Sequence, residues 1–409
     1  MTTNKNKIIN DPVYGFITIP NDLIFEIIEH PFFQRLRQIK QLGMTSLIYP
    51  GALHTRFHHA IGSMYLMQQT LYSLRSKNVE ISNEEFEGCL IAILLHDIGH
   101  GPFSHTLEFN LLNQVKHEQL SVLFFERLNT EFNGHLDLAL KIFTNQYPRK
   151  FFSQLVSSQL DIDRLDYLKR DSYFTGVSEG KIGSERIINM LNVHDDEIVV
   201  EEKGIYSIEN FLSARRLMYW QVYLHKTAVS AEEMLIKLIK RAKFLTQNGV
   251  KVEATPALKL LLERNIELRH FHEDPEILDL FALLDDTDVW ASMKFWREHE
   301  DTVLSGLSSK LLERRIFKII LANEKPLKEW VDTLKNKIQV KYQLSAEELE
   351  FFTGSGQISN SAYISSGQKI KIMTKKGLVL DIVKATDLPN IKAMSKIVTK
   401  HFFCWPEVD

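Results

Sequence analysis

Apolar residues recur at helical spacing near the start of the chain. Between residues 21 and 43 they fall on one face of a helix. Asn21 can cap the start of this helix, Pro31 restarts it and Gly43 ends it. The preceding residues, which include "GFITIP", predict an N-terminal arm with a strand or turn. A second helix is expected over about residues 54–76.

The segment "NEEFEGCLIAILLHDIG", residues 83–99, predicts a third helix with Asn83 as its cap and acidic residues in its first turn. Its second half is apolar on almost every side, which is typical of a central, buried helix. A further helix is predicted over roughly residues 156–170, and a glycine-bearing loop follows it.

The rest of the chain mixes strands and helices. Residues 196–208 predict a β-hairpin with its turn near Lys203–Gly204. A long helix is expected over about residues 209–245, and more helices up to about residue 350. In residues 361–383, apolar and polar residues alternate, and glycines mark turns between them. This pattern predicts strands. The expected fold class is mainly α, with a small β-hairpin and a C-terminal α+β region.

A chain of 409 residues is longer than one ordinary compact core requires. The segment "QNGVKVEATP" is the best linker candidate. We therefore expect one domain over residues 1–246, including the N-terminal arm, and a C-terminal α+β domain over residues 247–409. The second domain carries no motif to which we can assign chemistry.

Composition narrows the class of protein. The formal net charge is -3, so nucleic acid is an unlikely partner. The two cysteines, Cys89 and Cys404, form no CxxC pair, which argues against a zinc–thiolate site and suits a reducing compartment. The apolar run at residues 89–95 is far short of the roughly 20 residues that span a bilayer. With no apolar signal segment at the start either, we expect a cytoplasmic protein without membrane contact.

The stretch "LLHDIGHGPFSH" gathers side chains that can bind metals. It holds His96, Asp97, His100 and His105 within twelve residues. His96 and Asp97 are neighbours, so both can reach one metal only near an exposed helix end, and the glycines and proline that follow supply such an end. A buried aspartate after an apolar run is costly unless it is paired or bound to a metal.

Two other segments can complete such a site. "HTRFHHAIG" carries His58 and His59, and "LDIDRLDYLKRD" carries Asp163. A histidine, a His–Asp pair and a remote aspartate make a four-ligand site with room for water, and such a site can activate water and polarise a phosphoryl oxygen. Any one of these histidines alone is more often a hydrogen-bonded core residue, as His58, His59 or His117 could be.

In this order the motifs resemble those of the HD-domain phosphohydrolases, and more narrowly the branch of deoxynucleoside triphosphate triphosphohydrolases. The resemblance covers about residues 30–240 and includes "FQRLRQIKQLG", "YPGALHTRFHHAIG", "KHEQLS" and "LHKTA". It implies an HD-domain helical core in the first predicted domain. It also implies an enzyme that acts on a nucleotide or another phosphorylated small molecule, and a homo-oligomer of two or more copies.

By this resemblance the metal ligands are His59, His96, Asp97 and Asp163. His59 is preferred to His58 because the family motif reads R-F-x-H. A histidine–carboxylate site accepts Mn, Fe, Zn, Co or Ni, and Mg could enter with the substrate.

The family reaction is attack of a metal-bound hydroxide at the α-phosphorus, which releases nucleoside and triphosphate. His105 matches the general acid, and Glu108, one helical turn further on, could orient it and raise its pKa. His100 and His117 match histidines that line the phosphate pocket. Two arginines remain open between phosphate clamps and ordinary surface ion pairs: Arg56 and Arg164.

Further residues match contacts of the nucleoside. Gln41, Tyr167 and Asp171 match residues near the sugar, and His225 matches a substrate or supporting contact. On the helix that carries Asp163, offsets of 3, 4 and 7 put three more side chains on the same face: Asp166, Tyr167 and Arg170. We expect that face to combine the metal ligand, ring contacts and a phosphate-binding base.

Two positions depart from the family pattern. Val229 stands where a tyrosine packs on the sugar, and Glu232 stands where a lysine binds phosphate. A glutamate is unfavourable beside a triphosphate, so two alternatives stay open. One is a phosphomonoesterase or phosphodiesterase for another phosphorylated metabolite or nucleotide, and the other is a nucleotide-binding sensor.

Overall fold

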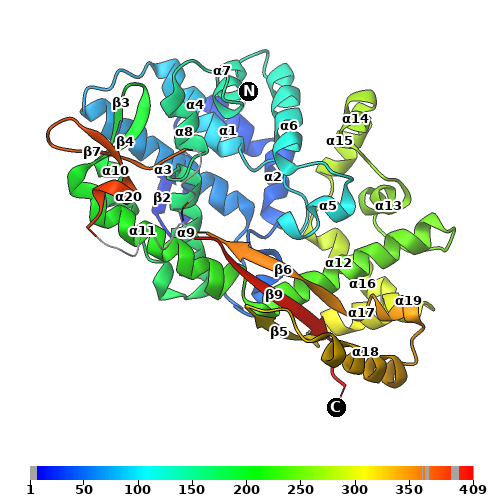
Figure 1. Ribbon diagram of the computed structural model, residues 1–409. Coiled ribbons are helices and arrows are strands. Elements are labelled where there is room, and N and C mark those ends of the chain that lie inside the picture. Colours follow the sequence, from blue (N-terminus) through cyan, green and yellow to red (C-terminus); the bar gives the residue numbers. More distant parts are fainter. Residues whose placement is uncertain (1–6, 362, 364–367, 388–395, 409) are drawn as a thin grey trace.

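The protein is built mainly from α-helices, as the sequence predicts (Figure 1). A computed structural model describes residues 7–361, 363, 368–387 and 396–408. The strands of this part form sheets of two, four and three members. None of the described helices is long and apolar enough to cross a membrane.

The N-terminal arm is a β-hairpin. Strands β1 (Ile8–Asp11) and β2 (Gly15–Thr18) pair antiparallel. Helix α1 (Asp22–Glu29) follows, and its N-cap Asn21 accepts a hydrogen bond from a backbone N–H of the first turn, as expected.

The predicted restart at Pro31 is confirmed, but the helix expected from there to Gly43 is wrong, because the chain breaks into short pieces. These are α2 (Pro31–Gln34) and the 3₁₀ helices η1 (Arg35–Gln38) and η2 (Gly43–Leu47). Proline cannot continue α1 since it lacks an N–H, and it restarts a helix at its own first position. Gly43 has a positive φ of 46° and begins the last piece instead of ending the first.

Three long helices form the centre: α3 (Arg56–Ser76), α4 (Asn83–Leu95) and α9 (Ile162–Thr175). Helix α3 packs against both of the others. The cap of α4 is Ser82 and not Asn83, since its hydroxyl accepts the N–H of Glu85 at 3.1 Å. The second half of α4 is fully buried, as its apolar pattern predicts.

Helix α9 begins later than expected. The chain from residue 150 to 156 forms a separate helix, and Asp161 then caps α9 by accepting the N–H of Arg164 at 2.8 Å. Further helices surround the three central ones: η3 (Ser104–Thr106), α5 (Glu108–Leu111), α6 (His117–Glu131), α7 (Asp137–Phe143), α8 (Lys150–Val156), η4 (Ser178–Gly180) and α10 (Ser184–Met190).

The second β-hairpin exists, but its predicted turn is wrong. Strands β3 (Leu191–His194) and β4 (Glu197–Glu201) are joined by Asp195–Asp196. Both aspartates have positive φ, 50° and 59°, a conformation that Asp tolerates better than most residues. Lys203–Gly204 instead belongs to η5 (Glu202–Gly204), which leads into the next helix.

The long helix predicted over residues 209–245 is interrupted. It consists of α11 (Ile205–Met218), the π-helix η6 (Tyr219–Tyr223) and α12 (Lys226–Gln247). His225 caps α12. Such π-turns are frequent at functional sites, and this one has a consequence for the site below.

The C-terminal part combines helices and strands, as expected. Its helices are α13 (Pro256–Glu263), α14 (Leu268–Glu273), α15 (Pro275–Ala282), α16 (Asp286–Trp296), α17 (Thr302–Leu312), α18 (Lys328–Tyr342), α19 (Ala346–Leu349) and α20 (Ile382–Ala385). Its strands are β5 (Lys318–Ala322), β6 (Gly354–Asn360), β7 (Lys371–Met373), β8 (Val379–Asp381) and β9 (Val398–Trp405).

These strands join the two parts of the chain. β9 lies between β5 and β6, and this sheet packs along α12 (Figure 1). β7 pairs parallel with β4, and β8 pairs with β7. Strands β7 and β8 confirm the strands predicted over 361–383, of which residues 362 and 364–367 lie outside the described residues. The domain boundary after residue 246 stays a prediction.

Candidate active site

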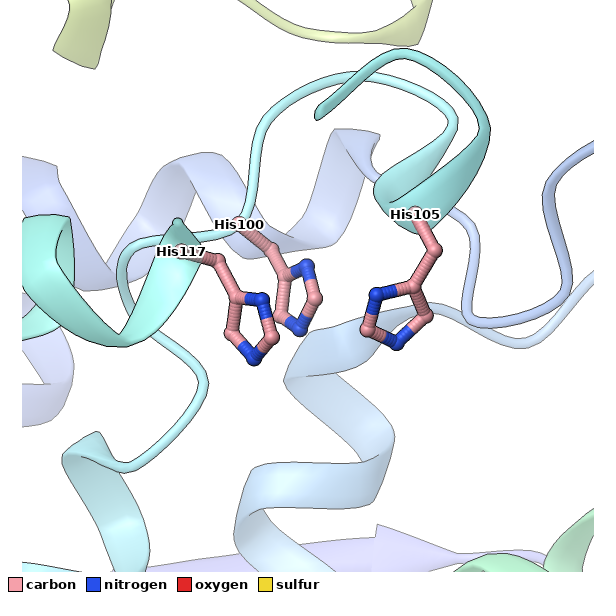
Figure 2. A group of neighbouring side chains, drawn as sticks. All are labelled: His100, His105 and His117. Atoms are coloured by element: carbon pink, nitrogen blue, oxygen red, sulfur yellow. The ribbon is translucent and has the colours of Figure 1, made fainter. Parts of the chain in front are cut away.

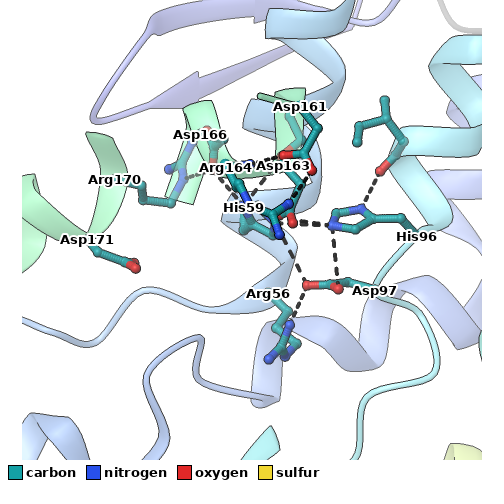
Figure 3. A network of polar contacts seen from close by, with 12 residues as sticks. Arg56, His59, His96, Asp97, Asp161, Asp163, Arg164, Asp166, Arg170 and Asp171 are labelled. Atoms are coloured by element: carbon teal, nitrogen blue, oxygen red, sulfur yellow. Dashed lines mark hydrogen bonds and ion pairs between the residues drawn. The ribbon is translucent and has the colours of Figure 1, made fainter. Parts of the chain in front are cut away.

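Three helices bring the four predicted metal ligands together. His59 comes from α3, His96 and Asp97 follow the end of α4, and Asp163 lies in the first turn of α9 (Figure 3). The Oδ1 of Asp163 is 3.1 Å from His59 Nε2 and 3.6 Å from His96 Nε2. The carboxylate of Asp97 lies 3.4 Å from His96 Nε2 and 3.7 Å from His59 Nε2.

Neighbouring residues reach this cluster together because α4 ends at Leu95. The His96 ring fixes its own tautomer by donating from Nδ1 to the carbonyl of Ile93 at 2.6 Å, which leaves Nε2 facing the cluster. Gly99 is required just beyond, since an added Cβ would lie 2.2 Å from the carbonyl oxygen of His117.

His59, and not His58, lies in the cluster. Its Nδ1 donates to the carboxylate of Asp166 at 2.7 Å, so its Nε2 lone pair points at the other ligands. The adjacent His58 turns away, and its Nδ1 accepts the backbone N–H of Thr55 at the start of α3.

The electrostatics of the cluster favour a cation. Burial disfavours a charged ring, but hydrogen bonds with Asp163 and Asp166 outweigh it and raise the pKa of His59 to about 10. Burial raises the pKa of the Asp163 carboxyl, yet its bonds to His59 and His96 hold that pKa below its usual range. A divalent cation can replace the bound proton. Two imidazole nitrogens with two carboxylates are a donor set that divalent transition metals accept.

A second group of histidines lies beside this cluster: His100, His105 and His117 (Figure 2). The rings of His100 and His117 stack with centroids 3.8 Å apart and planes within 16°. Ring nitrogens of nearly parallel rings point side by side and do not converge on one ion, so the pair suits two oxygens of one phosphate better than a metal. Burial, with Arg56 nearby, lowers the pKa of His100 well below its usual value.

Glu108, which was expected to orient His105, lies closer to His117. It accepts from both the backbone N–H and the Nδ1 of His117, each at 2.7 Å, but lies 3.6 Å from Nδ1 of His105. Its main partner is therefore His117, the first residue of α6, and Glu108 itself is the first residue of α5. The His105 side chain is 70 % exposed and faces the cavity described next.

Both groups of side chains open on one cavity of about 800 Å³. Eleven of the fourteen residues singled out from sequence line it: Gln41, Arg56, His96, Asp97, His100, His105, His117, Asp163, Arg164, Tyr167 and Asp171. His59 lies directly behind this wall, and Glu108 lies behind His117.

The two arginines of the cavity wall are held by carboxylates. Arg56 bonds Asp97 and donates from Nε to the hydroxyl of Ser104 at 2.9 Å. Arg164 bonds the buried carboxylate of its own N-cap, Asp161. They are not ordinary surface pairs, since each ion pair forms part of the wall, and a phosphate contact stays a prediction for both.

The comparisons with known proteins agree with this geometry. Residues 56–171 match the HD domain family, and residues 182–255 match the HD associated region. The protein YwfO of Bacillus subtilis (strain 168) is 34% identical over 330 residues, which cover 78% of this chain and 73% of that protein. The chain belongs to the HD-domain phosphohydrolase superfamily. All four candidate ligands lie within the HD match.

Other members of the superfamily are close in fold or sequence. The crystal structure of a phosphohydrolase from Bacteroides thetaiotaomicron VPI-5482 has a TM-score of 0.95 and 49% identity, and the match covers 98% of this chain and 100% of that one. The deoxynucleoside triphosphate triphosphohydrolase SAMHD1 homolog of Dictyostelium discoideum is 34% identical over 254 residues, 56% of this chain and 48% of that protein. HD domains bind divalent metals, and this chain is a metal-dependent phosphohydrolase of the superfamily.

One expectation for this HD site is wrong, and a second keeps only its alternative of a supporting contact. Arg170 is no phosphate-binding base, because it is fully buried between Asp166 and Asp11, at 2.9 and 2.7 Å. His225 is not in the cavity wall, because its Nδ1 accepts the N–H of Thr227 as the cap of α12.

The wall of the HD site also contains residues that the sequence did not reveal. Tyr219 and Tyr223 reach the cavity because the π-helix η6 shifts them off the face of α11. The Tyr223 hydroxyl donates to Asp171 at 2.7 Å, and His54 bonds the other oxygen of that carboxylate at 2.7 Å. Strands β6 and β9 add Gln357, Ile358 and Phe402. No local motif marks any of these positions.

Proposed function

We propose that this phosphohydrolase cleaves (deoxy)nucleoside triphosphates at the α-phosphorus and releases nucleoside and triphosphate. The observation that carries the proposal is that the metal-ligand cluster and the histidine group face one cavity. The two groups meet there, since Oδ1 of Asp97 lies 3.4 Å from Nε2 of His100. A phosphate held there would contact both groups at once. Relatives that are named deoxynucleoside triphosphate triphosphohydrolases support the same substrate class.

We assign metal binding, phosphate binding and proton donation to different residues of the cavity. His59, His96, Asp97 and Asp163 would hold a divalent metal, which supplies water activation and polarises a phosphoryl oxygen when bound. His100 and His117 would donate to phosphate oxygens. His105 would protonate the leaving 5′-oxygen.

Unpaired polar atoms in the wall support a polar ligand. Within the described residues, the buried Oε1 of Gln41 and the buried Nε of Arg164 have no hydrogen-bond partner. Buried polar groups are rarely left without a partner, so these two atoms fit a sugar hydroxyl and a phosphate oxygen. Tyr167 also lines the cavity, where a flat ring can pack on the nucleoside.

The test is a panel of deoxynucleoside and ribonucleoside triphosphates with Mn²⁺, Mg²⁺, Fe²⁺ and Co²⁺, scored for triphosphate release. We expect one triphosphate per nucleoside, and no product from His96→Ala. The absence of turnover for every nucleotide with metal-loaded protein would sink the proposal.

A second function is favoured by another part of the cavity wall. Glu232 and Glu233 line it, with Val229 beside them, and no lysine lines it within the described part of the chain. Burial raises the pKa of Glu232 to about 7. A monophosphate or diester would bring less negative charge to these carboxylates. Orthophosphate release from nucleoside monophosphates, with triphosphates left intact, would favour this alternative.

A homo-oligomer of two or more copies in the cytoplasm also remains part of the proposal. Light scattering on the full chain, with and without nucleotide, measures the number of copies. A monomer under both conditions would contradict this part and leave the proposed reaction untouched.

A further inference from the structure

A chain of buried charges runs from the N-terminal hairpin to the metal-ligand cluster (Figure 3 shows its inner three residues). Its members are Asp11, Arg170, Asp166 and His59, in that order. All four are at most 3 % exposed. Charged groups in such a place are stable only when each is paired.

Each link of this chain is a short bond. Asp11 Oδ2 accepts from Arg170 Nη1 at 2.7 Å. Arg170 then donates to both oxygens of Asp166, from Nε at 2.9 Å and from Nη2 at 3.0 Å. Asp166 accepts from His59 Nδ1 at 2.7 Å, which directs His59 Nε2 toward Asp163.

The fold is shaped around this chain. The other oxygen of Asp11 accepts the N–H groups of Val13 and Tyr14, each at 2.9 Å, so the turn between β1 and β2 holds the carboxylate in place. Gly62 leaves the space for the inner link, since a Cβ there would lie 2.0 Å from Arg170 Nη2 and 2.3 Å from Asp166 Oδ1.

We propose that Asp11 is a positioning residue for the metal ligand His59 and acts through Arg170 and Asp166. Asp166 alone would be a buried anion, and Arg170 alone with it would form a neutral pair. Asp11 adds a negative charge that keeps Arg170 in place, so these four side chains carry a net charge of −1 when His59 is neutral, as a metal ligand must be. A carboxylate behind a metal-binding histidine fixes its orientation and raises its basicity. The hairpin therefore sets the affinity for the metal.

This inference rests on the metal site of the proposed function, so its test measures metal binding and not turnover. Metal-stripped full-length protein is titrated with Co²⁺, followed by visible absorption. Asp11→Asn keeps the shape of the side chain and should raise the Kd for Co²⁺ about tenfold, the lower end for supporting partners of metal ligands. Asp22→Asn, which removes one charge from an exposed position of the same N-terminal segment, is the matched control and should leave the Kd unchanged.

A second variant tests the positioning role of Asp11 if Asp11→Asn does not fold. Arg170→Lys keeps the charge but cannot bond Asp11 and both oxygens of Asp166 at once, so it should also raise the Kd. If the variants that fold have a Kd for Co²⁺ within twofold of that of the control, the positioning role of Asp11 is overturned. This holds even if their thermal stability falls. Wild-type protein that binds no Co²⁺ at all would instead overturn the metal site and the proposed function with it.

Discussion

At the scale of single residues, the three histidines after α4 have separate tasks. His96 faces the other metal ligands, His100 stacks on His117, and His105 stands in the cavity with most of its side chain exposed. Of these three histidines, His96 is the one that contacts both Asp97 and Asp163. A loss of one ring should therefore produce a different defect from a loss of another.

His105→Ala should keep the bound metal and lower turnover by about 10²–10⁴-fold, the usual contribution of a general acid. Asp97→Ala should lose both metal and turnover. Metal content per chain and the rate of nucleotide hydrolysis, measured on the same samples, separate the two cases. Full activity in His105→Ala would assign the acid to another residue.

The pH dependence of binding should depend on Glu232. Burial raises its pKa to about 7, so the carboxyl loses its proton as the pH rises through neutrality. Its ionised form repels phosphate, and the KM for a triphosphate should therefore increase above pH 7.

Glu232→Gln should flatten that increase because it stays neutral. Glu118→Gln removes another carboxylate of the cavity wall, one that is 61 % exposed, and serves as the control. An unchanged pH profile of KM in Glu232→Gln would show that this carboxylate does not face the phosphates.

At the scale of elements, the loop that follows α4 is held from two sides. Arg35 of η1 is buried and donates to the carbonyl oxygens of Ile98 and His100 at 3.0 and 2.8 Å. Asp286 at the start of α16 accepts the N–H of Phe103 at 2.8 Å. Phe103 has a positive φ of 54°, which is strained for a bulky residue and persists only where the surroundings enforce it.

Asp286→Ala should loosen this loop without removing the metal. A buried N–H left without an acceptor costs about 1–3 kcal/mol, so hydrogen exchange at Phe103 should accelerate about tenfold or more. Asp274→Ala, which removes the side-chain cap of α15, is the matched control. Equal exchange at Phe103 in the two variants would contradict this role of Asp286.

The sequence predicted the centre of the site better than its surroundings. His59, His96, Asp97 and Asp163 were recognisable because they lie in motifs whose order along the chain resembles that of the HD-domain phosphohydrolases. The pairing of Asp11 with Arg170 joins positions 159 residues apart, and no local pattern reports it. The same holds for the break at η6, since the pattern of α11 and α12 continues across it.

At the scale of the whole molecule, segments from both ends of the chain contribute to the site. Asp11 supports His59 through Arg170, and strands β6 and β9 contribute residues to the cavity wall. The parallel pairing of β4 with β7 joins the two parts a second time. The C-terminal region, to which the sequence assigned no chemistry, thus takes part in shaping the cavity.

Gln357 tests this contribution, because it lines the cavity from an exposed position of β6. Gln357→Ala should weaken nucleotide binding about 2- to 10-fold, the effect of one hydrogen bond, and leave the metal content unchanged. Ser355→Ala, on the same strand but outside the cavity wall, is the control. Identical nucleotide affinity in both variants would remove β6 from the binding site.

The most direct test of the central claim is the metal content of the full-length protein, measured by elemental analysis after purification and reconstitution. We expect about one divalent transition metal ion per chain in the wild type and in His58→Ala, and almost none in His59→Ala. These two variants remove neighbouring rings from the same helix, only one of which faces Asp163. A wild type without bound metal, or equal metal in the two variants, would contradict the account.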